Sequence, residues 1–439
     1  METIHLKSVD PVAQALLRQA ATEGRDLAWD RFEAQQPQDG FVRTGLSCAF
    51  GCMQGPCRID PFGRGAKQGI CGIDRDEMVA AQMLRLCVNG ALEAGIAGDD
   101  VIAGAAMLRR PSAGAEAMLE LALSLALSVA GAASDGASGS FELNAGYGAL
   151  AANGPVLGVA GLIDTNLAGA LAASDAITAV SLGSWIQTGS GLLPFACTSG
   201  EAELALISKR VHGLLAGAGT DGALIALAEK LGIAVIAADS ADGVIAATQK
   251  AAASASSGVI DVNAAQSGAA TACFGADAVA GALKGKGQWA IIGGPDTPHQ
   301  SLGWIATEVP PALMAEDLNV AVFGDAALWA TKAGLAGGDH GSPATVLGPN
   351  AGVVEAVKAA GPDNIRGVCF TALADARDVA LALGIAAMGV DVMVATPLPI
   401  WGSQTVMASL DAMLDARGGA IGHVDKPADA DAVLAWFEG

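Results

Sequence analysis

The spacing of apolar residues predicts helices in the first part of the chain. Val12, Leu16 and Leu17 recur at helical spacing, and Pro37 and Gly40 follow them as helix-ending residues. Two later segments show the same period. The expected helices cover residues 11–32, 75–90 and 113–130, and the Gly- and Ser-containing residues 131–139 are expected to form a linker.

After this linker, short continuous apolar runs alternate with Ala-rich segments. Apolar strands with helices between them predict parallel sheets that are covered on both faces. The expected strands cover residues 156–160, 176–182, 234–237, 258–262, 289–292, 320–323, 368–370 and 390–395.

These elements predict an α/β fold. We expect an N-terminal helical region over residues 1–134, then a Rossmann-like parallel-sheet domain over residues 135–257 and a second one over residues 258–439. No G-x-G-x-x-G segment follows any of the expected strands, so we expect no NAD site.

Composition narrows the class of protein. Only 16% of the 439 residues are charged, and the net charge of −21 disfavours nucleic acid and anionic membranes as partners. The first residues do not resemble a signal peptide, and the apolar run over residues 119–133 is short and contains Glu120. We therefore expect a cytoplasmic protein without a membrane span, whose acidic surface is solvated.

Four of the eight cysteines lie within one short segment, spaced C-x3-C-x4-C-x13-C. Soft thiolates suit zinc or an iron–sulfur cluster. Zinc sites usually combine two close pairs, whereas three cysteines crowd one turn-rich loop here, which favours [4Fe-4S]. Arg58, Arg64 and Lys67 offset the negative charge of such a cluster. The expected ligands are Cys48, Cys52, Cys57 and Cys71.

The residues around these cysteines resemble the nickel–iron carbon monoxide dehydrogenases of anaerobes, a family related to the hybrid-cluster proteins. The resemblance rests on residues 31–38, 45–46, 55–63 and 69–72 and is dense over residues 29–85. It implies that the cysteine loop holds a [4Fe-4S] electron-transfer cluster beside the two-fold axis of a homodimer. A redox partner such as a ferredoxin would dock there. The chain is markedly shorter than the family norm.

The same resemblance implies that the nickel-containing C-cluster is missing. In the family, one histidine and five cysteines hold this cluster between two α/β domains. Four residues stand where the family has ligand cysteines, and they line the vacated site: Trp185, Gly294, Asp325 and Asn350. Residues 159–165 and 144–149 resemble the segments of the remaining ligands but contain no cysteine or histidine. The catalytic lysine aligns with Arg377, which cannot exchange protons near neutral pH.

A second family cluster, shared across the dimer axis, would need cysteines where this chain has Asp39 and Ser47. We prefer one [4Fe-4S] cluster per chain, held by all four cysteines. In the alternative, Cys48 serves an intersubunit cluster, with Asp39 as a further ligand, and three cysteines remain for the other site.

The remaining cysteines, Cys87, Cys197, Cys273 and Cys369, are expected to be buried thiols, and the loop residues His299 and His340 to be solvent-exposed. We expect no nickel, and no metal at the vacated site, where Trp185 would fill part of the volume.

Three functions fit this sequence. The first is electron transfer, redox sensing or an accessory role without CO oxidation. The second is an enzyme of different redox chemistry with a remodelled site in the vacated cleft. The third is a scaffold for cluster maturation. Whether the chain is an enzyme stays open at this point.

Overall fold

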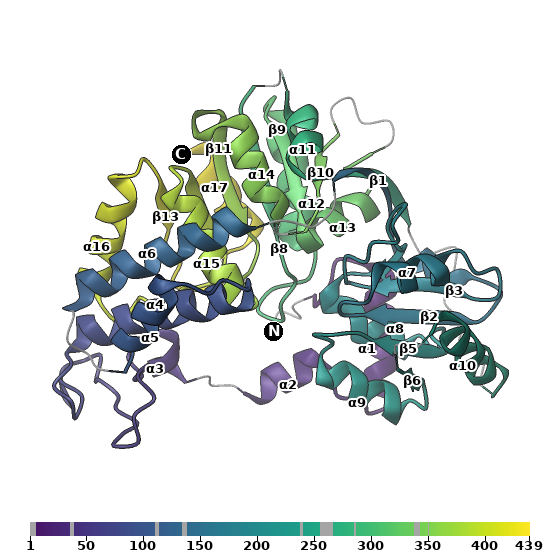
Figure 1. Cartoon of the computed structure of the whole chain (residues 1–439), viewed down its shortest axis with the longest axis horizontal. Helices are drawn as coiled ribbons and strands as arrows, with labels where there is room; N and C mark the ends of the chain where they lie inside the picture. The colour runs from purple at the N-terminus through teal and green to yellow at the C-terminus, as the bar shows by residue number, and fades with distance from the viewer. Residues whose placement is uncertain are drawn as a thin grey trace, which may run out of the picture. The chain divides into compact units, whose positions relative to one another are not determined.

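The structure is a computed structural model, and it describes residues 6–35, 39–109, 114–133, 138–237, 240–254, 267–284, 287–337, 343–349 and 351–439. The chain forms a mixed α/β fold that divides into two compact units, each built from separate stretches of sequence (Figure 1). Unit 1 comprises Met1–Ala34, Asp135–Ala282 and Pro295–Gly352, and unit 2 comprises Gln35–Ser134, Leu283–Gly294 and Val353–Gly439. The predicted three-domain division and its Rossmann-like topology stay predictions.

The strands of unit 1 follow the order β9-β10-β7-β1-β4-β3-β2-β5-β6. All neighbours pair in parallel except β1 and β7, which run antiparallel from Gly139↔Phe274 to Ala145↔Gly268. The strands are β1 (Gly139–Ala145), β2 (Val156–Ala160), β3 (Thr178–Leu182), β4 (Phe195–Cys197), β5 (Gly213–Ala216), β6 (Ala234–Ile236), β7 (Gly268–Phe274), β9 (Asn319–Phe323) and β10 (Thr345–Leu347).

The helices of unit 1 begin at recognisable caps. Asp10, Asp164 and Asp221 precede helices and accept backbone N–H groups of the first turn. The helices are α1 (Pro11–Thr22), α2 (Ala28–Ala34), α7 (Thr165–Ala172), α8 (Ala202–Ile207), α9 (Gly222–Lys230), α10 (Ala241–Ser254), α11 (Ala276–Leu283), α12 (Trp304–Ala315) and α13 (Gly324–Lys332).

Unit 2 contains the parallel strands β8 (Trp289–Gly294), β11 (Ile365–Phe370), β12 (Asp391–Val394) and β13 (Ala420–Gly422), in the order β13-β12-β11-β8. Its helices are α3 (Gly40–Arg43), α4 (Arg75–Glu93), α5 (Asp99–Met107), α6 (Gly114–Ala132), α15 (Ala376–Ala387), α16 (Gln404–Asp415), α17 (Ala430–Glu438) and most of α14 (Ala351–Ala360).

Three helices of unit 2, α4, α6 and α15, pack closely against one another. A side chain at Gly90 would place its Cβ 2.4 Å from the Ala376 carbonyl oxygen, and one at Gly384 would lie 2.3 Å from that of Ala126. These glycines therefore let the helix backbones approach each other. By length and composition alone, α6 is long and apolar enough to cross a membrane, whereas no membrane span was expected from the sequence.

Several predicted elements differ from the observed ones. The helix predicted over residues 11–32 is two helices, because Gly24 adopts the left-handed conformation (φ +63°) just after α1 ends. The strand predicted over residues 258–262 lies outside the described residues. Six strands, β1, β4, β5, β7, β10 and β13, were not predicted. Four of these six are only three or four residues long, and β1 alternates exposed and buried residues rather than forming a continuous apolar run.

Candidate metal centre and a buried polar network

The cysteine loop of unit 2 is fixed by backbone pairing. Cys48 N–H donates to the Cys57 carbonyl at 2.9 Å, and Ile59 N–H donates to the Leu46 carbonyl at 3.0 Å. Ser47 and Arg58 form an antiparallel bridge between them. The backbones of Cys48 and Cys57 therefore lie side by side.

Asp60 organises the second half of the loop, a role that sequence reasoning missed. Its carboxylate accepts the backbone N–H groups of Phe62 at 3.1 Å, Gly65 at 2.6 Å and Arg64. These hydrogen bonds, with that from Phe62 first, lower the pKa of Asp60. Arg75 donates to the Asp60 carbonyl at 3.1 Å. The conformation of the glycine-rich segment is thus fixed by hydrogen bonds to the Asp60 carboxylate.

The chain returns to Cys57 shortly before α4 begins. Ile70 N–H donates to Cys57 Sγ at 3.4 Å, and a Cβ at Gly69 would lie 3.7 Å from that sulfur. Asp74 and Glu77 then form a reciprocal capping box that starts α4. Cys71 is therefore held between a turn against Cys57 and a capped helix.

The four thiols of the loop fit an iron–sulfur cluster. None forms a disulfide; Cys52 and Cys71 are exposed, and Cys48 and Cys57 are partly buried. Burial raises the pKa of Cys48, and negative charge on the other three thiols raises it further. A bound iron–sulfur cluster would favour the thiolate form of the four cysteines.

Within the described ranges, no three His, Cys, Asp or Glu side chains are arranged to hold a single metal ion. A [4Fe-4S] cluster, however, distributes its thiolates over the corners of a cube rather than around one ion. The cluster is therefore inferred from the four thiols of the loop and not from the distances between their sulfur atoms. That these four cysteines are its ligands stays a prediction.

Asp39, the possible additional ligand, has other partners. Its carboxylate caps α3 by accepting Phe41 N–H at 2.9 Å, and it pairs with Arg58 at 2.8 Å. The Arg58 guanidinium also lies over the Phe41 ring, 5.3 Å from its centroid. A role for Asp39 as a cluster ligand stays a prediction. Its carboxylate would have to give up these contacts to bind a cluster.

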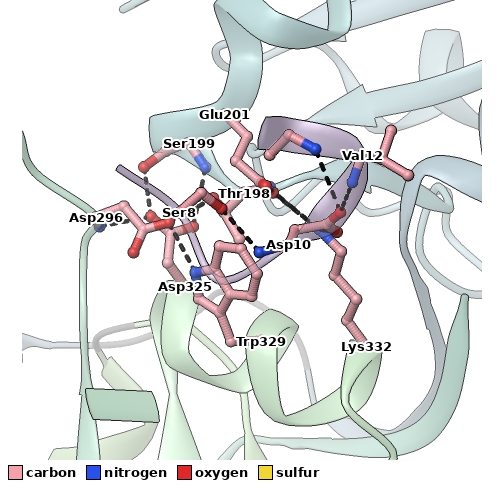
Figure 2. A network of polar contacts seen from close by, with 11 residues as sticks. Ser8, Asp10, Val12, Thr198, Ser199, Glu201, Asp296, Asp325, Trp329 and Lys332 are labelled. Carbon is pink, nitrogen blue, oxygen red and sulfur yellow. Dashed lines mark hydrogen bonds and ion pairs between the residues drawn. The ribbon is translucent and has the colours of Figure 1, made fainter. Parts of the chain in front are cut away.

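Asp325, predicted to line the vacated site, is a buried hydrogen-bond acceptor in unit 1 (Figure 2). It lies in the first turn of α13 and accepts Ser199 N–H at 3.1 Å, Asp296 N–H at 2.8 Å and the Ser199 hydroxyl. Its carboxylate therefore ties together three segments that are far apart in sequence.

Asp296 forms the second acidic centre of this network. It accepts the Thr198 hydroxyl at 2.5 Å and the Trp329 indole N–H at 2.9 Å. Burial, and then the negative charge of Asp325, raise the pKa of Asp296 well above its ordinary value. Burial also raises the pKa of Asp325, so this pair retains protons to unusually high pH.

Lys332 pairs with two other carboxylates of the network, those of Asp10 and Glu201 (Figure 2). Its ammonium group pairs with Asp10 and lies 3.2 Å from Glu201, and all three side chains are buried. The same ammonium lies over the rings of Tyr147 and Trp329, 4.6 and 4.4 Å from their centroids. The sequence signalled only Asp10, as a cap before Pro11.

The other predicted lining residues are not part of this network. Trp185 packs edge-on against Phe195 and Phe274, with centroids 5.1 and 5.8 Å apart. Gly294 belongs to unit 2, where its φ of +122° and the Ala372 carbonyl, 2.9 Å from a hypothetical Cβ, leave no room for a side chain. Asn350 lies outside the described residues.

The remaining cysteines and histidines largely follow expectation. Cys87, Cys197, Cys273 and Cys369 are buried, and burial raises the pKa of Cys87 and of Cys369 to about 12. His299 is exposed, with its ring centroid 4.8 Å from that of Phe32. His340 lies outside the described residues.

A G-x-G-x-x-G segment does follow a strand. Gly217, Gly219 and Gly222 have this spacing between β5 and α9, and no expected strand preceded them because β5 was not predicted. However, the Asp221 carboxylate caps α9 at its N-terminus, where a phosphate would bind. The Ala218 backbone also pairs with Leu162 through two hydrogen bonds. Both contacts disfavour the binding of a dinucleotide at this turn.

Known proteins resemble the chain over different lengths. No protein-family model matches it. Carbon monoxide dehydrogenase 1 of Methanosarcina mazei is 49% identical over 90 residues, which cover 20% of this chain and 14% of that relative. Carbon monoxide dehydrogenase 1 of Carboxydothermus hydrogenoformans is 49% identical over 84 residues, which cover 19% and 13% of the two chains.

Solved structures match the whole fold. The as-isolated, Ni-free carbon monoxide dehydrogenase of Thermococcus sp. AM4 superimposes with a TM-score of 0.84 at 18% identity, covering 98% of this chain and 96% of that one. Carbon monoxide dehydrogenase IV of Carboxydothermus hydrogenoformans gives a TM-score of 0.77 at 18% identity, covering 98% of each chain. The chain is a carbon monoxide dehydrogenase relative.

This relationship is uneven along the chain. High identity to the curated dehydrogenases is confined to about a fifth of the sequence, whereas the fold agrees throughout. The matched segment also spans about a seventh of the M. mazei dehydrogenase. The relationship therefore identifies a carbon monoxide dehydrogenase-like iron–sulfur protein and leaves its activity to be argued from its own residues.

Proposed function

We propose that this protein is a cytoplasmic iron–sulfur protein that transfers or senses electrons, or serves as an accessory subunit, and does not oxidise CO. The observation that carries the proposal is the exposed loop of four free cysteines in unit 2. It would hold one [4Fe-4S] cluster through Cys48, Cys52, Cys57 and Cys71, with no nickel. When bound, this cluster supplies one-electron redox chemistry.

The exposure of the loop supports electron exchange with a second protein. Cys52 and Cys71 are exposed, and the neighbouring Met53 and Phe62 are 96% and 82% exposed. Apolar side chains around an accessible redox centre suit transient docking of a partner such as a ferredoxin.

The residues at the former ligand positions support the absence of CO oxidation. The Asp325 carboxylate already accepts three hydrogen bonds, and Gly294 offers no side chain. A metal at Asp325 would have to displace Ser199 and leave buried donors unsatisfied.

The cluster is tested by iron and acid-labile sulfide analysis of anaerobically purified protein, together with its visible and EPR spectra. We expect about four irons per chain and no nickel. Cys57→Ser should lose the cluster, whereas the matched control Cys87→Ala should keep it, because Cys87 is buried on α4. A colourless anaerobic protein would contradict the proposal.

The proposed absence of CO oxidation is tested by measuring whether the protein reduces a viologen dye with CO after nickel has been added. We expect no turnover. Nickel-dependent CO oxidation would refute the non-catalytic role even if the cluster in the loop is present.

A further inference from the structure

Unit 1 contains a cleft at the amino ends of two neighbouring strands, whereas the cysteine loop belongs to unit 2. Its walls come from the residues just before β5, the residues just before β6, one face of α10 and the turns that follow α1 and α8. The cleft has a volume of about 780 Å³, within the range of small-molecule sites.

The cleft is basic in a strongly acidic protein. The chain has 45 Asp and Glu against 24 Lys and Arg. The cleft nevertheless collects Arg25, Lys209, Lys250 and His212, and no Asp or Glu is among the lining residues that the structure describes. Glu23 pairs with Lys209 at 2.6 Å and with Arg25 at 3.9 Å, so one carboxylate stands against three cations. The carboxyl ends of α9 and α10 offset part of the remaining charge.

Several donors in the cleft are available to a ligand. Lys250 is exposed, and within the part of the chain that the structure describes it has no carboxylate at ion-pair distance. Arg25 Nε lies 3.9 Å from the Glu23 carboxylate, too far for a hydrogen bond, and is a buried donor without an acceptor. An acceptor on a ligand would satisfy it.

His212 is fixed as a neutral donor. Its Nδ1 accepts the backbone N–H of Val156 at 3.0 Å, which leaves the ring proton on Nε2. Burial, and then the charge of Arg210, lower the pKa of His212, so the ring stays neutral at neutral pH.

Lys209 has an unusual backbone conformation. Its φ is +57°, in the left-handed region that a side chain disfavours. This turn directs the chain from α8 toward β5 and places Lys209 on the cleft.

The rest of the cleft is apolar. Leu231, Ile233, Ala247 and Ala251 line it, and the lining residues that the structure describes include no Phe, Tyr, Trp, Asp or Glu. A cationic ligand or metal ion would find an excess of positive charge, because the Glu23 carboxylate is already paired, and a nucleobase would find no Phe, Tyr or Trp ring to stack on. We propose that this cleft binds a small organic anion, a phosphate or carboxylate attached to an aliphatic chain. The anion would lie against Lys250, Arg25 and His212, and the chain against the apolar wall.

Isothermal titration of the full-length protein at low salt tests this site. The probes are octyl phosphate, octanoate, inorganic phosphate and octylammonium. We expect both octyl anions to bind, octyl phosphate at least tenfold more tightly than inorganic phosphate, and octylammonium not to bind. Binding should weaken as salt increases.

Two variants locate the binding. Lys250→Ala should weaken octyl phosphate about tenfold, because it removes a charged hydrogen bond. Lys358→Ala, the matched control at an exposed residue of α14, should change it less than twofold. Both sites are exposed on helices, so both variants should fold.

A third variant tests the apolar wall of the cleft. Ala251→Phe should weaken octyl phosphate but not inorganic phosphate. Equal affinity for inorganic and octyl phosphate would refute the apolar part of the site. Unchanged affinity of the Lys250→Ala variant for octyl phosphate, or no binding of either octyl anion at millimolar concentration, would refute the site as a whole.

Discussion

At the scale of single residues, the protonation of Asp296 and Asp325 couples the buried network to pH. Both folded-state pKa values lie above the ordinary value, because of burial and, for Asp296, the charge of Asp325. A carboxyl group with a raised folded pKa stabilises the fold at low pH, and this contribution is lost as pH rises through the folded pKa.

We therefore predict that Asp296→Asn raises the stability of the folded protein above that of the wild type at about pH 8, and that this gain is smaller at about pH 5. The amide oxygen can still accept from Thr198 and Trp329, while the charge facing Asp325 and Glu201 is removed. The expected gain in midpoint temperature at the higher pH is about 2–4 °C, measured by differential scanning calorimetry. Asp277→Asn, at an exposed residue of α11, controls for net charge. Equal pH dependence of both variants would contradict this account.

Gly294 supports a second prediction at this scale. Restoring a cysteine at this position, Gly294→Cys, should destabilise the protein by about 3 kcal/mol, because the backbone is strained for any side chain and Cβ would meet the Ala372 carbonyl. Gly418→Ala should cost only about 1 kcal/mol, since Gly418 has a positive φ but open space. Denaturant titration compares the two. A fully stable Gly294→Cys would show that the strand end can relax.

At the scale of elements, the start of α4 is coupled to the cysteine loop. Asp74 caps α4 three residues after Cys71. Asp74→Ala should cost about 1 kcal/mol of stability and should also speed the release of iron to a chelator. Asp429→Ala removes the equivalent cap of α17 at a similar cost, and we expect it to leave iron release unchanged. Identical release rates for both variants would mean that the cap does not restrain Cys71.

At the scale of the whole molecule, the family resemblance predicts a homodimer whose axis passes near residues 39–48. Val42 is an exposed apolar residue of this segment, at 44% exposure. Val42→Asp should convert the dimer to monomers, as measured by light scattering at micromolar concentration. Ile102→Asp changes a residue of α5 that is 68% exposed, and we expect that variant to stay dimeric. A wild-type monomer would contradict the prediction.

The sequence by itself determined the candidate cluster loop, because its chemistry is local. The four cysteines lie within a short stretch of chain, so spacing and residue type were enough to propose them as cluster ligands. The strands with continuous apolar runs, such as β2 and β9, were predicted for the same reason. The short strands were not, and β5 and its glycine turn were therefore missed.

Only the tertiary structure decided what the distant polar residues do. Ser199 and Asp325 are 126 positions apart, and Lys332 and Glu201 are 131 positions apart, yet each pair is in direct contact. The basic cleft likewise joins the turn after α1 to α10. No local pattern encodes these contacts, because buried charges are tolerated only where the packed fold supplies partners for them.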